Sequence, residues 1–90
     1  MPSYLVETYL ARDGADGRSE RDRRARSAAE ALTRTGTRVR FLGSTYVPVD
    51  EMCFFSFDAP SSREVARALE LAGLEAMRVV EALSSGKERP

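Results

Sequence analysis

The 90-residue sequence contains no histidine, no tryptophan and a single cysteine, Cys53. Without histidine, the chain lacks the usual activator of a serine nucleophile and the commonest metal-ligating side chain, so conventional serine hydrolysis and a histidine-based metal site are excluded. A lone cysteine cannot form an intramolecular disulfide, which fits a reducing compartment. We therefore expect a cytoplasmic protein in which Cys53 is a small buried apolar side chain.

Long apolar stretches and net charge are missing as well. No segment approaches the roughly 18 to 20 apolar residues that span a bilayer, and the opening MPSYLVETYL lacks the features of a signal peptide. The 14 basic residues balance the 14 acidic residues, so no net charge attracts nucleic acid over long range. We expect neither a membrane nor a nucleic acid as partner.

Three segments are rich in the β-branched and aromatic residues that are typical of strands, namely Tyr4–Leu10, Thr37–Val49 and Met52–Phe57. The middle segment alternates, with Val39, Phe41, Thr45 and Val47 on one side and Arg38, Arg40, Leu42, Ser44 and Tyr46 on the other. The turn residues between the second and third segments predict an antiparallel hairpin.

Two further segments carry helix signals. After the glycine-rich and aspartate-rich loop ARDGADGRS, Ser19 is expected to cap a helix that ends at Gly36. A capping box at 61–64 starts a second helix, which Gly73 would end. The apolar positions of each helix share one side, so both helices should lie on a sheet.

The segment Met77–Ala82 fits two structures. The surrounding LEAMRVVEAL has helical propensity throughout, whereas its central residues fit a short strand equally well. As a strand, it completes a βαββαβ order, with four strands in one antiparallel sheet and two helices on one face. We predict this ferredoxin-like α+β fold for a single domain over residues 1–83, followed by a disordered tail over 84–90.

This pattern resembles an actinobacterial family of small ferredoxin-like proteins of unknown function, one member of which is known as a nickel-binding protein. The matching segments are MPSYLVETYL, VRFLGSTYVPVDEMCFFSFDAP and SSREVARALELAGLEAMRVVEAL, and they retain the family's glycine at Gly73 and its arginine at Arg78. The resemblance implies a homodimer of the α+β barrel type.

The resemblance also implies nickel, but this chain departs from the family where a metal ligand is expected. A Glu-His pair of the family falls at Ala68 and Leu69, and Phe55 stands where relatives often carry cysteine. Because nickel favours nitrogen-rich ligand sets, a chain without histidine is a poor match. We therefore predict no cofactor and no metal site.

In the predicted sheet, one face packs on the helices and the other is open. The alternation assigns Val6, Val39, Phe41, Cys53, Phe55, Phe57 and Val79 to the helix side. The open side combines aromatic and charged residues, as a pocket or an interface would. We predict that its ligand-binding residues are Glu7, Tyr9, Arg40, Ser44, Tyr46, Phe54, Ser56 and Arg78, and we assign no catalytic residue.

Glu7 is the central candidate, because it is a carboxylate between apolar neighbours in a strand. It could act as a general base or form an ion pair with Arg40 or Arg78.

Three functions follow from these alternatives. We favour a non-enzymatic homodimeric module whose open faces meet around a small ligand. The others are a small cofactor-free enzyme of the cyclase, isomerase or monooxygenase type with a cavity under the sheet, and a scaffold or interaction protein.

Overall fold

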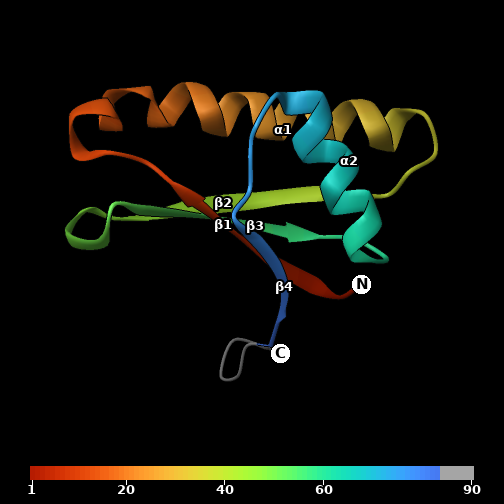
Figure 1. Cartoon of the computed structure of the whole chain (residues 1–90). Coiled ribbons are helices and arrows are strands. Elements are labelled where there is room, and N and C mark those ends of the chain that lie inside the picture. The colour runs from red at the N-terminus through yellow and green to blue at the C-terminus, as the bar shows by residue number, and fades with distance from the viewer. Residues whose placement is uncertain (84–90) are drawn as a thin grey trace, which may run out of the picture.

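The computed structural model describes residues 1–83 and has the βαββαβ order. The elements are β1 (Ser3–Tyr9), α1 (Arg18–Arg34), β2 (Arg40–Val47), β3 (Met52–Asp58), α2 (Ser62–Ala72) and β4 (Arg78–Ala82). Both helices cover the same face of the sheet (Figure 1). The predicted ferredoxin-like fold is therefore confirmed, while the predicted disordered tail over 84–90 lies outside the described residues.

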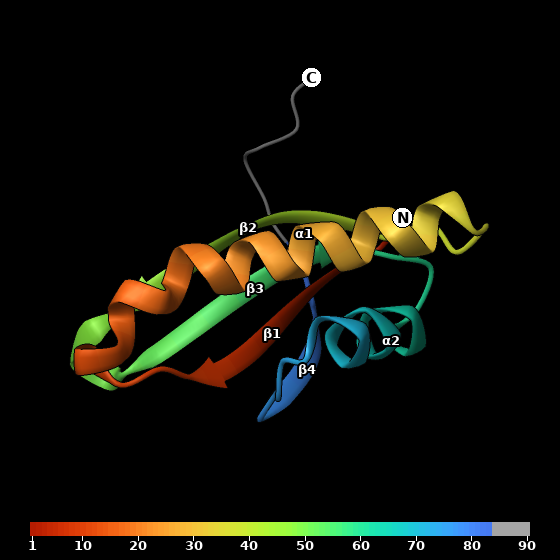
Figure 2. The ribbon, with the colours of Figure 1, turned by 90° about the horizontal axis from the view of Figure 1, so that it is seen from above.

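The four strands form one antiparallel sheet in the order β2-β3-β1-β4. Figure 2 shows α1 running along β2 and β3, with α2 on the side of β4. The segment that fitted both a helix and a strand is the strand β4, because Val79 pairs with Val6 of β1 and packs on the core. Tertiary pairing thus outweighs the local helical propensity. No helix in residues 1–83 is long and apolar enough to cross a membrane.

The core lies between the sheet and the helices. Its largest fully buried side chains include Phe55 and Phe57, and Phe41 contacts both rings at centroid distances of 6.1 and 5.4 Å. Most of the buried side chains on α1 are alanines, which are short, so the helix backbone can approach the sheet closely. Val6, Val39, Phe41, Cys53, Phe55 and Phe57 are buried on the helix side as predicted, and Val79 packs against this buried cluster.

The two helices start differently. On α2, Ser61 accepts a hydrogen bond from the Arg63 backbone and Gly73 ends the helix with φ 71°, so the predicted caps are confirmed. On α1, the predicted Ser19 cap is wrong, because the helix begins at Arg18 and its N-cap Gly17 makes no side-chain hydrogen bond. The predicted loop before it contains a 3-10 helix, η1 (Arg12–Gly17), which leads the backbone directly into α1.

The strand β2 is shorter than predicted and contains an irregularity that reverses its alternation. Phe41 pairs with Phe57 and Gly43 pairs with Ser56, so Leu42 is an additional residue in β2. Beyond it, Ser44 pairs with Phe55 and Tyr46 with Cys53, and these partners face the helices. The predicted open-face positions of Ser44 and Tyr46 are therefore wrong. Thr45 and Val47, predicted to face the helices, lie on the open face instead.

Candidate functional site

The open face of the sheet is a surface of four cross-strand rows that no helix of the described chain covers (Figure 1). From one end of the sheet to the other, the rows are Val47–Met52–Tyr9, then Thr45–Phe54–Glu7–Arg78, then Gly43–Ser56–Leu5–Val80, and finally Arg40–Asp58–Ser3–Ala82. We call this surface the open face. Most of its members are apolar or small, so its charged side chains stand out against an apolar background.

The polar centre of the open face is an ion pair between Glu7 and Arg78. Arg78 donates to Oε2 of Glu7 through Nη2 at 2.9 Å and through Nε at 3.2 Å. The Glu7 side chain is 19% exposed and that of Arg78 is 66% exposed. Both hydrogen bonds use Oε2, so Oε1 lies outside this pair and could accept a donor from a ligand. The ion-pair alternative for Glu7 thus describes the structure, with Arg78 as the partner.

Apolar side chains surround this pair. Phe54 is the cross-strand neighbour of Glu7 on one side, and Leu5 and Val80 occupy the next row. A depression of about 500 Å³ begins beside them and is lined by Leu5, Leu42 and Ser56 among others. The combination of an apolar surface with one half-buried carboxylate and one cation is typical of a site that orients a small molecule through few polar contacts.

Tyr9 lies in the row next to Glu7, but its hydroxyl is directed toward the β2–β3 turn. It donates to Oε1 of Glu51 at 3.3 Å, and the other carboxylate oxygen of Glu51 accepts from the Arg12 backbone at 3.1 Å. The negative charge of Glu51 raises the pKa of Tyr9 above its ordinary value. A phenol held protonated in this way can donate a hydrogen bond but is a poor base.

The eight predicted site residues therefore separate into three groups. Glu7, Tyr9, Phe54, Ser56 and Arg78 lie in adjoining rows of the open face, whereas Arg40 lies at its far end opposite Asp58. The remaining two are on the helix side.

The two helix-side residues have structural contacts. The hydroxyl of Tyr46 donates to the carbonyl of Leu10 at 2.7 Å, which ties β2 to the end of β1. The carbonyl of Ser44 accepts from Nη2 of Arg18 at 2.9 Å. On the face that the helices cover, Tyr46 thus connects β2 to Leu10 and Ser44 connects β2 to α1.

Thr45 is an open-face neighbour of Phe54 that the alternation of the sequence missed. The signal that could have found it is Gly43, because a glycine inside a strand often marks a bulge. Gly43 has φ 146°, a backbone conformation that other residues rarely adopt.

Cys53 and the acidic side chains do not form a metal site in the described chain. The Cys53 thiol is fully buried on the helix side, and burial raises its pKa, although the charges of Arg21 and Arg18 partly oppose this. Among residues 1–83, no group of three or more histidine, cysteine, aspartate or glutamate residues is close enough to hold a metal ion. These residues do not fit the nitrogen-rich ligand set of nickel, and we derive no chemistry through a metal.

No protein-family description matches the chain, and no curated protein sequence matches it. Among solved structures, it is similar to the crystal structure of SCO4226 from Streptomyces coelicolor A3(2), with a TM-score of 0.70 and 21% sequence identity. The superposition covers 92% of this chain and 99% of SCO4226. This likeness to an actinobacterial protein shows that the two chains share a fold over nearly their whole length.

Proposed function

We propose that the protein is a homodimeric module that binds a small ligand between the open faces of two copies. The observation that carries this proposal is the Glu7–Arg78 pair, which joins an interior strand to the edge strand β4 on an uncovered and largely apolar sheet face. A sheet that packs helices on one face leaves the other available for a partner. The protein would use this face as its binding surface.

A second copy of the chain is the partner that this face fits best. A chain of this length buries only about 60 to 65% of its unfolded surface, so covering Phe54, Leu5 and Val80 in a dimer would stabilise it. The charged residues at the centre are already paired with one another, which lowers the cost of removing them from water. A two-fold arrangement would enclose the depression beside Leu5 as a cavity.

The polar centre suggests how the ligand is held. Oε1 of Glu7 can accept a hydrogen bond, and the exposed guanidinium of Arg78 retains donors that Glu7 does not use. A ligand with one donor and one acceptor close together, such as an amide or a heterocycle, would satisfy both while its apolar body contacts Phe54. The same contacts weaken the alternative of an acid-base enzyme, because Glu7 is held by a cation and Tyr9 by a carboxylate.

The oligomeric state tests the first part of the proposal. Sedimentation of the wild-type protein in the micromolar range should give a dimer, and Phe54→Asp should give a monomer because it would bury an unpaired charge in the interface. Leu71→Asp is a matched control, since Leu71 is 57% exposed on α2, away from the open face. A monomeric wild type, or a Phe54→Asp protein that stays dimeric, would contradict the proposal.

Native mass spectrometry tests the second part. We expect the purified wild-type dimer to carry additional small-molecule mass, and we expect Arg78→Gln to lose that mass while remaining folded. Arg63→Gln removes the same charge from an exposed position of α2 and should retain the mass. Retention of the mass by Arg78→Gln would contradict the assignment of Arg78 to the binding site, and wild-type dimers without any bound molecule would favour a scaffold role.

A further inference from the structure

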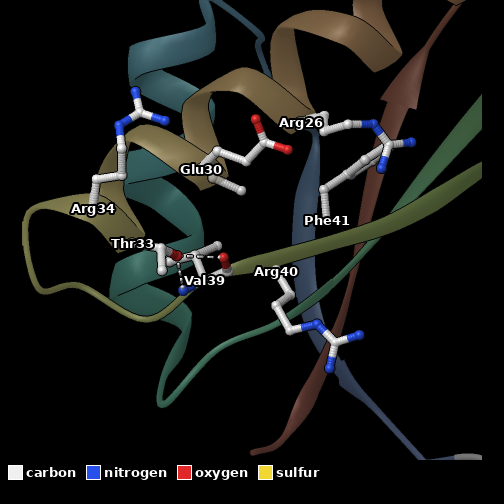
Figure 3. Close-up of a pocket in the computed structure, with 8 residues that line it drawn as sticks. Arg26, Glu30, Thr33, Arg34, Val39, Arg40 and Phe41 are labelled. Carbon is white, nitrogen blue, oxygen red and sulfur yellow. Dashed lines mark hydrogen bonds between the residues drawn. The ribbon is translucent and has the colours of Figure 1, made fainter.

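A second hollow lies on the helix side of the sheet, between α1 and the edge strand β2 (Figure 3). Its volume is about 450 Å³, and its floor consists of Ala29, Val39 and Phe41. The hollow exists because β2 is the last strand on its side, so no further strand fills the space beneath this side of the helix. We call it the α1–β2 groove.

The groove is lined by more positive than negative charge. Arg26 and Arg34 come from α1 and Arg40 from β2, while Glu30 is the only acidic residue of the lining. Within residues 1–83, the ion pairs join Arg23 to Glu20 and Arg78 to Glu7, so none of the groove's arginines is neutralised by an ion pair. The protein as a whole has no net charge, which makes this local excess a property of the groove.

Two hydrogen bonds and a cation–π contact connect residues of α1 to the residues at the floor of the groove. The Thr33 hydroxyl accepts from the Val39 backbone N–H at 3.2 Å and donates to the Val39 carbonyl at 2.9 Å, which fastens the start of β2 to α1 (Figure 3). The guanidinium carbon of Arg26 lies 5.0 Å from the centroid of the Phe41 ring. This cation–π contact holds a cation beside an apolar floor before any ligand is present.

The side chains that line the groove point in different directions. In Figure 3 the Arg26 guanidinium lies over the Phe41 ring, the Glu30 carboxylate projects between Arg26 and Arg34, and the Arg40 side chain points away from α1. Arg26 is therefore the cation best placed to contact a ligand on the floor. Glu30 lines the same groove, so its negative charge would repel a ligand that carries more than one negative charge.

We propose that the α1–β2 groove is a second binding site, which takes a small aromatic carboxylate. Its ring would lie along the apolar floor and its carboxylate would pair with Arg26, whose planar guanidinium matches a carboxylate. A single negative charge suits the groove better than the double charge of a phosphate monoester, because Glu30 lines the same space. The site shares neither Glu7 nor Arg78 and lies mainly on the helix side of the sheet, so it is separate from the function proposed above.

Amide chemical shifts of the uniformly labelled protein provide the test, with 1-naphthoate as the anionic probe and neutral 1-naphthamide as its isostere. We expect saturable shifts at residues 39–41 with 1-naphthoate, and binding of 1-naphthamide that is weaker by about fivefold or more, as for the loss of one exposed charge contact. Shifts centred on residues 5–7 and 54 would place the probe on the open face and overturn the proposal.

Two substitutions with opposite expected effects make the test independent of folding. Arg26→Gln should weaken 1-naphthoate binding by about fivefold, whereas Glu30→Gln should strengthen it by about twofold. Arg24→Gln is the matched control, because Arg24 is an exposed arginine of the same helix outside the groove. Equal affinity for the two probes, no saturable binding of 1-naphthoate, or weaker binding by Glu30→Gln would each overturn the proposal.

Discussion

Arg78 contacts Oε2 of Glu7 through two guanidinium nitrogens, and this pair joins the edge strand β4 to the central strand β1 across the open face. It is a short and partly exposed ion pair in an apolar setting. Exposed pairs of this kind contribute little to stability, so we expect the fold to persist without it.

A double-mutant cycle on this pair should therefore give a small coupling energy. We expect Glu7→Gln, Arg78→Gln and the double variant to yield a coupling of about 0.5 to 1 kcal/mol in urea unfolding. High salt should reduce it, because the Arg78 side chain is largely exposed. A coupling of several kcal/mol would instead identify the pair as a structural element of the fold.

Gly43 should be much less replaceable than Gly17. An added Cβ meets no atom within 4 Å at either position, so the two differ in backbone conformation, with φ 146° at Gly43 and φ −80° at Gly17. We expect Gly43→Ala to lower the free energy of unfolding by about 1 to 3 kcal/mol. Gly17→Ala should leave it nearly unchanged. Equal effects in urea unfolding would show that the bulge does not require glycine.

Tyr46→Phe should lower stability without changing assembly. The variant leaves the Leu10 carbonyl without the hydroxyl that it accepts from at 2.7 Å, and we expect a loss of about 1 kcal/mol in thermal or urea unfolding. Tyr9→Phe is the comparison, because its longer hydrogen bond to Glu51 is exposed and should matter less. If Tyr46→Phe reduced ligand binding at unchanged stability, the placement of Tyr46 on the helix side would be contradicted.

Cys53 should make stability fall at alkaline pH. Because burial raises the pKa of its thiol, the folded chain holds the thiol proton more tightly than the unfolded chain does. Its contribution is fully present below about pH 8.5, the ordinary pKa of a thiol, and is lost as the pH rises through the higher pKa of the folded state.

Urea unfolding between about pH 7 and about pH 10 measures this effect. Cys53→Ala should show a smaller decline of stability over the alkaline part of this range, although its stability at neutral pH is lower because of the cavity it creates. An iodoacetamide assay should label the native thiol far more slowly than the unfolded one. Rapid labelling of the folded protein, or an unchanged decline in Cys53→Ala, would contradict the prediction.

Local signals in the sequence were sufficient for several elements. The Ser61 cap, the Gly73 stop and the aromatic strand β3 each depend on residues that are neighbours along the chain, so the sequence predicted them correctly. The helix-facing core residues also followed from alternation, which holds wherever a strand has no irregularity. These features determine the fold and the existence of an open face.

The composition of the open face needed the tertiary structure. One additional residue at Leu42 transfers Ser44 and Tyr46 to the helix side and brings Thr45 and Val47 to the open face, and a period of two cannot reveal such a shift. The strand β4 depends on pairing with β1 rather than on local propensity, and the partner of Glu7 depends on which strand lies beside it. The sequence by itself determined every element except β4 and most of the buried core, whereas pairing with β1 decided β4 and the register between strands decided which side chains share the candidate site.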